Sequence, residues 1–252
     1  MNQTRRNQIV ELIEKKRTLS NAEIMERFNI SIETVRRDLL YLENKGALKR
    51  VYGGAIKNEV NSVEPNYTNR ESLNDSEKIA IAMEAEKLID KDDTVFFDIG
   101  TTVLHLANRV DSSKKVLAFT NSLRTAMALA DKAKSVILTG GQLRYGEFCV
   151  SGSIAEENML RFNVNKVIIG VGGITENGIT DFIEEEASLR KKMIKNAETV
   201  IALADYSKFG VRAVCNVCDL TDVDILITDE KAPEDLLKLA QKNGVKVIVA
   251  KV

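Results

Sequence analysis

Seven short runs rich in β-branched residues, separated by stretches with helical periodicity, constrain the fold of this 252-residue chain more than any other feature. Short apolar runs between turn residues are typical of buried strands, and apolar residues three or four positions apart are typical of helices. We expect strands at 94–98, 115–120, 135–139, 166–170, 199–204, 224–228 and 245–250, and helices at 76–90, 102–110, 122–132, 153–161, 184–197 and 233–243. This alternation predicts an α/β domain with a largely parallel sheet.

Glycine, hydroxyl and charged residues gather where these expected strands end. Ligands of such domains bind at the carboxyl ends of the strands, so these residues are candidates for a binding site. Backbone N–H groups and two hydroxyls at the start of helix 102–110 suit a phosphate, and Lys208 adds a compact cation after another strand. The candidate ligand-binding residues are Asp98, Gly100, Thr101, Thr102, Thr120, Asn121, Ser122, Gly141, Arg144, Asp181, Glu186 and Lys208.

Each of these residues also has a purely structural interpretation. A glycine followed by two threonines forms a tight strand-to-helix turn without any ligand. The acidic residues 184–186 suit the N-terminal end of a helix dipole, and Lys208 suits a solvated loop. The clustering of polar residues at four strand ends favours the binding site over these alternatives.

The N-terminal part of the chain shows three short helices. Apolar spacing predicts a helix over 4–16. Ser20 and Glu23 form a capping box, in which each side chain bonds to the other residue's backbone N–H, and predict a second helix at about 21–28. Asn29 tolerates left-handed backbone in a tight turn, and Ser31 caps a third helix. Three helices with this short turn between the second and third indicate a helix-turn-helix.

The third helix is expected to read DNA, because the N-terminal part of a recognition helix enters the major groove. We expect an inner side of Val35, Leu39, Leu40 and Leu42, and outward residues Glu33, Thr34, Arg36, Arg37 and Asp38. After Gly46, an alternating basic segment runs into Gly53 and predicts a wing that neutralises phosphates. The candidate DNA-binding residues are Ser31, Glu33, Thr34, Arg36, Arg37, Lys49, Arg50 and Tyr52. The alternative is that these charges form an ordinary solvated surface.

Charge divides the chain in the same way as the helical and strand patterns. Residues 1–58 carry 12 basic and 7 acidic side chains, whereas the remainder carries 24 basic and 30 acidic ones. Between the two parts, residues 58–75 lose periodicity and collect Asn and Ser. The sequence therefore predicts a winged helix-turn-helix domain at 1–57, a linker at 58–75 and an effector-binding domain at 76–252.

Composition excludes several classes of protein. With 44% apolar and 29% charged residues, the chain is neither disordered nor collagen-like. No apolar run reaches the ~18 residues that span a bilayer, and the N-terminus lacks the apolar core of a signal peptide. We therefore expect a cytoplasmic protein with no membrane partner.

The cysteines and the single histidine give only weak signals. Cys215 and Cys218 form a C-x-x-C, but a zinc site needs further ligands and a redox site needs a helix start, so buried or incidental thiols are the favoured interpretation. His105 falls within the apolar pattern of helix 102–110 and is expected to pack there. We predict no metal site and no cofactor.

The motifs together resemble the DeoR family of bacterial transcription regulators. Over residues 5–57 the resemblance rests on the segment from Phe28 to Leu39, on Leu48-Lys49-Arg50 and on Gly53-Gly54-Ala55. The sequence departs from the family pattern where Met25, Asn29 and Tyr52 stand in place of a small residue, glycine and histidine. None of these departures threatens the fold.

The second half resembles the C-terminal effector domain of the same family, over about residues 76–230. The matching segments are Asp98-Ile-Gly-Thr-Thr, Thr120-Asn121-Ser122, Gly140-Gly141-Gln142-Leu143-Arg144, Glu186-Ala187 and Asp205-Tyr206-Ser207-Lys208-Phe209-Gly210. That domain is similar to ribose-5-phosphate isomerase and glucosamine-6-phosphate deaminase. The resemblance implies a regulator, most often a repressor of a sugar or polyol catabolic operon, whose grip on operator DNA responds to a phosphorylated sugar.

The main alternative is a sugar-phosphate isomerase or deaminase-like enzyme. Such an enzyme needs an acid or base near the strand end Gly170-Val171-Gly172-Gly173, which contains no carboxylate. We therefore expect no enzymatic activity and no catalytic residues. A helix-turn-helix reads few base pairs, so we expect a homodimer or homotetramer on repeated half-sites. The effector, the operator and the choice between dimer and tetramer do not follow from the sequence.

Overall fold

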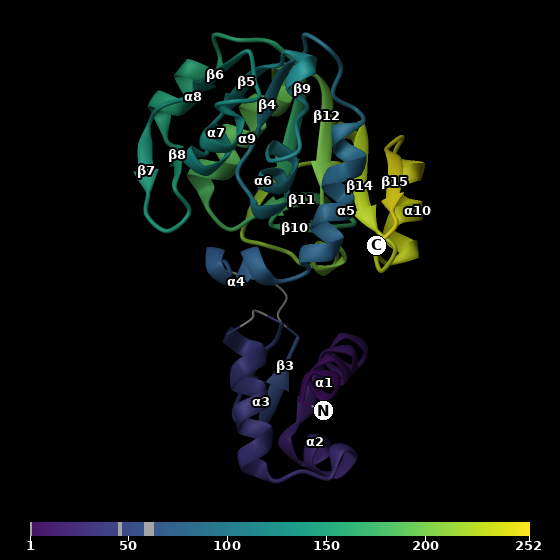
Figure 1. The fold of residues 1–252 in the computed structure, drawn as a ribbon. Helices are drawn as coiled ribbons and strands as arrows, with labels where there is room; N and C mark the ends of the chain where they lie inside the picture. The colour runs from purple at the N-terminus through teal and green to yellow at the C-terminus, as the bar shows by residue number, and fades with distance from the viewer. Residues whose placement is uncertain (1, 45–46, 58–62) are drawn as a thin grey trace. The chain divides into compact units, whose positions relative to one another are not determined.

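The computed structural model describes residues 2–44, 47–57 and 63–252 (Figure 1). The chain divides into two compact units, Met1–Pro65 and Asn66–Val252. Residues 58–62 of the predicted linker lie outside the described residues. In the described part of the chain, no helix is long and apolar enough to cross a membrane.

The smaller unit combines three helices with a small antiparallel sheet. Its elements are α1 (Asn2–Lys16), β1 (Thr18–Ser20), α2 (Asn21–Phe28), α3 (Ile32–Asn44), β2 (Lys49–Val51) and β3 (Gly54–Ile56). The predicted capping box begins α2, since Ser20 accepts from the Glu23 N–H and Glu23 accepts from the Ser20 N–H. Asn29 ends α2 in the left-handed region, with φ of 48°. These local signals confirm the winged helix-turn-helix.

The wing depends on β3, a strand that the apolar periodicity of the sequence does not predict. β3 pairs with both β2 and β1, so the sheet order is β1-β3-β2. Buried residues of all three helices, including Ile9, Ile24 and Val35, form the core with Leu48 and Ala55 from the wing. The wing is therefore packed against the helices rather than projecting alone.

The larger unit is built on a seven-stranded sheet in the order β15-β14-β12-β9-β4-β5-β6, and every neighbouring pair is parallel. The strands are β4 (Thr94–Phe97), β5 (Leu117–Thr120), β6 (Ser135–Leu138), β9 (Val164–Gly170), β12 (Ala197–Leu203), β14 (Ile225–Asp229) and β15 (Lys246–Ala250). All seven lie within two residues of their predicted starts. The prediction of an α/β domain with a largely parallel sheet is confirmed.

Helices cover both faces of this sheet, because successive strand residues point to opposite faces. Val95 and Phe97 join one buried cluster, and Phe96 joins the other. The first cluster includes residues of α5 (Asp75–Glu86), α6 (Thr101–Ala107) and α7 (Leu123–Leu129), and the second includes residues of α8 (Ser153–Met159), α9 (Glu184–Lys195) and α10 (Glu234–Lys242). The sheet is thus the middle layer of three.

Two smaller sheets and one short helix go beyond the predicted elements. The hairpin of β7 (Gln142–Arg144) and β8 (Cys149–Ser151) follows β6. A second small sheet joins β10 (Gly173–Thr175), β11 (Gly178–Asp181) and β13 (Cys215–Cys218). Helix α4 (Tyr67–Ser72) falls within the segment 58–75 that the sequence predicts as linker. Residues 66–75 belong to the larger unit, so the structure ends the connection between units at about residue 65.

Candidate functional site

One face of α3 carries the candidate DNA-reading residues. Glu33, Arg36, Arg37 and Leu40 are spaced three and four residues apart, so they share a helix face, and all four are exposed. The expectation that Leu40 lies inside is wrong, because its side chain is 44% exposed. Leu40 stands one position after the core residue Leu39, which turns it about 100° away from the core. An exposed leucine here suits the methyl group of thymine.

The two arginines on this face differ in their partners. Arg36 Nη1 lies 3.2 Å from Glu33 Oε1, and both side chains are exposed. In the described parts of the chain, Arg37 makes no ion pair. Arg37 can therefore meet DNA without first breaking an internal ion pair.

The other two candidates on this helix lie at its start, where Ser31 Oγ lies 3.1 Å from Thr34 Oγ1.

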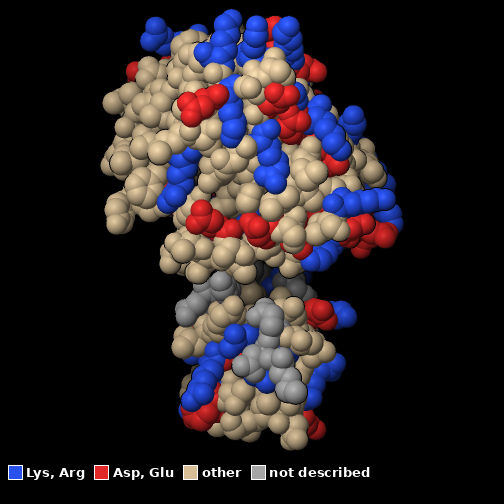
Figure 2. All heavy atoms as spheres, in the orientation of Figure 1, with Lys and Arg blue, Asp and Glu red and all other residues tan. Residues whose placement is uncertain are grey.

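The wing places its basic residues beside the same unit's third helix. Arg50 donates from Nε to Glu43 Oε2 at 2.6 Å, and its backbone N–H donates to Glu43 Oε1 at 2.8 Å. Tyr52, at the tip between β2 and β3, is fully exposed, and Lys49 is exposed. Basic and acidic side chains are interspersed on the face of both units drawn in Figure 2.

Asp38 corrects the sequence interpretation of this helix. It was expected to point outward, but it is buried and bonds to two arginines of α1, with Arg5 Nε and Arg6 Nε each 2.7 Å from its carboxylate. The Arg6 guanidinium also stacks on Tyr41, 3.8 Å from the ring centroid. Asp38 therefore joins α3 to α1 and is unavailable to DNA.

In the larger unit, the candidate ligand residues sit at the ends of neighbouring strands. The order β12-β9-β4-β5 brings the loops after these four strands to one edge of the sheet. The loops after β4 and β9 approach closely, because a Cβ on Gly170 would lie 2.6 Å from the Ile99 carbonyl oxygen. Only glycine fits there, and this close approach fixes the position of Gly100.

Asp98 and Asp181 meet at a buried arginine of α9, Arg190, which is not among the candidate ligand-binding residues. Arg190 Nε lies 2.6 Å from Asp98 Oδ2, and its Nη1 bonds to Asp181 Oδ2. All three side chains are buried, Arg190 at 2% exposed. Burial raises the pKa of Asp98, although the guanidinium opposes this shift. Burial lowers and the two carboxylates raise the pKa of Arg190, and the carboxylates prevail.

A second ion pair joins the β7–β8 hairpin to α9. Arg144 Nε lies 2.6 Å from Glu186 Oε1, and the Cys149 thiol donates to the same oxygen at 3.3 Å. Burial first, and the Glu186 charge second, raise the pKa of Cys149 to about 12, so it is a thiol at neutral pH. The hairpin begins at Gly141, whose φ of 116° and close approach to the Ser151 carbonyl exclude a side chain.

The residues after β5 lie against this hairpin. The Val150 N–H donates to the Asn121 carbonyl at 2.8 Å, and Ser122 forms a bridge with Cys149. Ser122 caps α7 by accepting from the Thr125 N–H, and its own N–H donates to Thr120 Oγ1. Asn121 is buried, and its Oδ1 has no hydrogen-bond partner among the described residues. Asn121 therefore presents an unused buried acceptor in the described part of the chain, as does the hydroxyl of Thr125.

The predicted phosphate end is spread over two strand ends. Thr101 and Thr102 are buried at the start of α6, behind Gly100. Lys208 is half-buried and ends a short 3-10 helix after β12, next to Asp205, which accepts from the Ser207 N–H at 3.0 Å. One strand, β9, separates β4 from β12, so the two ends lie roughly 10 Å apart.

The two cysteines of the C-x-x-C and the single histidine are not among the candidate ligand-binding residues. Cys215 and Cys218 lie on β13, and burial raises the pKa of both thiols, that of Cys218 to about 12. Such thiols are poor nucleophiles at neutral pH. His105 Nε2 lies 3.1 Å from Asp75 Oδ1, and burial lowers its pKa. Within the described ranges, no group of three or more His, Cys, Asp or Glu side chains could hold a metal ion.

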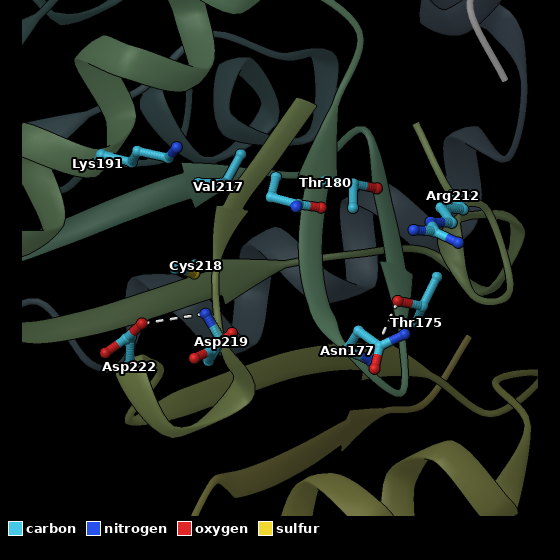
Figure 3. Close-up of a pocket in the computed structure, with 10 residues that line it drawn as sticks. Thr175, Asn177, Thr180, Lys191, Arg212, Val217, Cys218, Asp219 and Asp222 are labelled. Atoms are coloured by element: carbon cyan, nitrogen blue, oxygen red, sulfur yellow. Dashed lines mark hydrogen bonds between the residues drawn. The ribbon is translucent and has the colours of Figure 1, made fainter. Parts of the chain in front are cut away.

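A cavity of about 530 Å³ lies on the small sheet of β10, β11 and β13, and Cys218 is one of the residues that line it (Figure 3). Its walls include Lys191 and Arg212, which form no ion pair in the part of the chain that the structure describes. Asp222 also lines the cavity and accepts from the Asp219 N–H at 3.0 Å (Figure 3). None of the predicted ligand residues lines this cavity.

Comparison with known protein families matches both units of the chain. Residues 5–61 match the DeoR-like helix-turn-helix domain, and residues 73–230 match the DeoR C terminal sensor domain. Together these matches cover most of the sequence, in the order that the sequence motifs indicate.

Individual relatives share the whole length of the chain. The putative aga operon transcriptional repressor of Escherichia coli O157:H7 is 32% identical over 97% of this chain and 93% of its own. The glycerol-3-phosphate regulon repressor of Escherichia coli strain K12 is 30% identical over 98% and 99%. Among solved structures, ribose 5-phosphate isomerase A from Methanocaldococcus jannaschii gives a TM-score of 0.41 at 15% identity, covering 54% of this chain and 55% of that one.

Proposed function

Since the chain belongs to the DeoR family of helix-turn-helix transcription regulators, we propose that it represses a sugar or polyol catabolic operon and that a phosphorylated sugar controls its binding to operator DNA. The family consists of regulators rather than enzymes. Both relatives described above are named as repressors, one of an aga operon and one of a glycerol-3-phosphate regulon.

The arrangement of strand ends carries the proposed effector site. Gly100, Thr101 and Thr102 offer backbone N–H groups and hydroxyls, and Lys208 offers a cation about two strands away. A phosphate held by Gly100, Thr101 and Thr102 can be reached by the Lys208 side chain, and the two together span the distance between the two strand ends. The sugar hydroxyls then extend toward Asn121, whose buried Oδ1 has no hydrogen-bond partner among the described residues, and toward Arg144 and Glu186.

Asp98 and Asp181 take a supporting part in this proposal. The sequence places Asp98 among the candidate ligand-binding residues. Its Oδ2, however, bonds to Arg190, which also bonds to Asp181. We assign to this triad the task of holding the loop after β4 in place, so that Gly100 and the threonines stay at the site.

Lys208→Ala and Thr101→Val are expected to leave operator binding intact and to abolish the response to metabolite. Both side chains belong to the effector site and lie in the other unit from the DNA-reading helix. The measurement is operator affinity of the full chain with and without each member of a panel containing glycerol 3-phosphate and hexose phosphates. A matched control is Lys134→Ala, which removes an exposed lysine of the same unit. A full metabolite response in both site variants would show that the site lies elsewhere.

The same panel tests whether a phosphorylated sugar binds at all. A compound present at 100 times its dissociation constant should raise the free energy of unfolding by about 2.7 kcal/mol. Because coupling between two sites is reciprocal, operator DNA must change the affinity for that compound by the factor by which the compound changes DNA affinity. If neither ligand changed the affinity for the other, the two sites would be uncoupled.

We expect the protein to be a homodimer or homotetramer, free and on DNA. One helix-turn-helix contacts few base pairs, so useful specificity needs two half-sites. The larger unit exposes apolar side chains suited to association, including Tyr145 and Leu143 on the β7–β8 hairpin. Sedimentation of the full chain, alone and with operator DNA, measures the state. A monomer under both conditions would contradict the expectation.

A further inference from the structure

Helix α4 is the first helix after the segment that connects the two units, and side chains of three other elements hold it. Tyr67 is buried at its start, and the guanidinium of Arg124 on α7 lies 4.2 Å from the Tyr67 ring centroid. The same guanidinium lies 4.9 Å from the ring of Phe148, next to β8. Arg124 thus packs between α4 and the β7–β8 hairpin.

An ion pair fastens α4 to that hairpin directly. Arg70 Nη2 lies 2.5 Å from Glu147 Oε2, and the two side chains are 15% and 8% exposed. A pair shielded to this extent is screened far less by salt than a surface pair. The contact joins residues that are 77 positions apart in the sequence, so it constrains the helix relative to the hairpin.

The end of α4 is also held by Lys78 of α5. Its Nζ donates to the carbonyl oxygen of Leu73 at 2.5 Å and to that of Arg70. Burial lowers the pKa of Lys78 to about 8. Carbonyl groups at a helix end lack partners within the helix, so this amine satisfies them. Arg70 is therefore fixed through its backbone to α5 and through its side chain to Glu147.

Glu147 also connects the Arg70 ion pair to the proposed effector site, because it lies near Arg144. Arg144 Nη2 lies 4.0 Å from the same Glu147 oxygen that Arg70 contacts, while Arg144 Nε contacts Glu186. Arg144 and Arg70 therefore share the Glu147 carboxylate, so a ligand oxygen that took Arg144 in place of Glu147 would leave Arg70 as the nearer cation beside that carboxylate.

We propose that Arg70 is the positioning residue that transmits effector occupancy to helix α4, and so to the segment leading to the DNA-binding unit, through its ion pair with Glu147. The direction of transmission rests on the proposed function, because it takes Arg144 as an effector ligand. The ion pair as a restraint on α4 does not rest on it.

Hydrogen exchange of the full chain without metabolite tests the restraint. Arg70→Gln and Glu147→Gln should each speed amide exchange over residues 67–73 by about tenfold, and the effect of the double variant should be less than additive, because both single variants remove the same ion pair. Arg70→Glu combined with Glu147→Arg should restore slow exchange. Glu71→Gln, an exposed acid on the same helix, is the control and should change nothing. Unchanged exchange in both single variants would overturn the proposal.

The response of DNA binding separates a positioning role from a merely structural one. The DNA is the genomic fragment that wild type selects most strongly, and the metabolites are glycerol 3-phosphate and the hexose phosphates of the panel above. Arg70→Gln should keep its thermal stabilisation by whichever compound stabilises wild type, yet lose at least tenfold of the metabolite effect on DNA affinity, and Arg70→Lys should recover part of it. A full metabolite effect in Arg70→Gln would overturn transmission through Arg70. If no compound stabilises wild type, the proposed function fails, while the exchange measurement still decides whether the pair restrains α4.

Discussion

Arg190→Met is expected to lower the free energy of unfolding of the larger unit by about 3–5 kcal/mol, the cost of removing one partner from a buried ion pair. Asp98 and Asp181 would both remain buried without the cation that compensates them, only 1% and 4% exposed. Methionine fills a similar volume, so the loss comes from charge rather than from a cavity. Urea unfolding monitored by circular dichroism measures the change. Lys191→Met is the control, because this neighbouring lysine is exposed and should cost less than about 0.5 kcal/mol.

A triple variant separates the charge effect from packing. Asp98→Asn, Asp181→Asn and Arg190→Met together remove all three charges, and a buried ionic group replaced as a whole is often neutral in stability. We therefore expect the triple variant to be more stable than Arg190→Met alone. If it were less stable, the triad would owe its importance to packing, and the assigned electrostatic role would be wrong.

Arg37→Ala is expected to weaken operator binding by about 10- to 100-fold, which corresponds to ~1–3 kcal/mol for a bidentate contact to a base. Arg37 lies on the exposed face of α3 and forms no ion pair within the described residues, so no internal rearrangement offsets its loss. The effect should be strongest for the operator and weak for random DNA. Lys49→Ala should instead weaken binding to all sequences alike and reduce the dependence on salt, as expected for a phosphate contact. Fluorescence anisotropy at several salt concentrations measures both.

Controls for this experiment come from both units. Lys134→Ala removes one positive charge from the larger unit and should leave operator affinity unchanged. Arg36→Ala should have a smaller effect than Arg37→Ala, since Arg36 already interacts with Glu33. Unchanged operator affinity in a combined Arg36, Arg37 and Arg50 variant would contradict DNA binding through this face.

On helix α3, the spacing of the residues and their chemical type give opposite predictions for Asp38 and Leu40. Val35, Asp38, Leu39 and Leu42 follow the three- and four-residue spacing of a buried stripe, and all four are buried. Periodicity alone therefore places Asp38 inside and Leu40 outside. Chemical type suggested the reverse, because a carboxylate is rarely buried without a partner. The partners, Arg5 and Arg6, stand more than 30 positions away, and nothing local identifies them.

Local patterns in the sequence were enough to predict the main strands and helices of this protein and their order. Strand and helix periods, the capping box at Ser20 and the turn at Asn29 act over a few residues, and they predicted the helix-turn-helix and the parallel sheet. The contacts between distant residues became visible only in the folded structure, where Arg190 meets Asp98 and Asp181, and Arg70 meets Glu147. Such pairs depend on strand order and on hairpin placement, which follow from the packing of the whole sheet rather than from any local pattern.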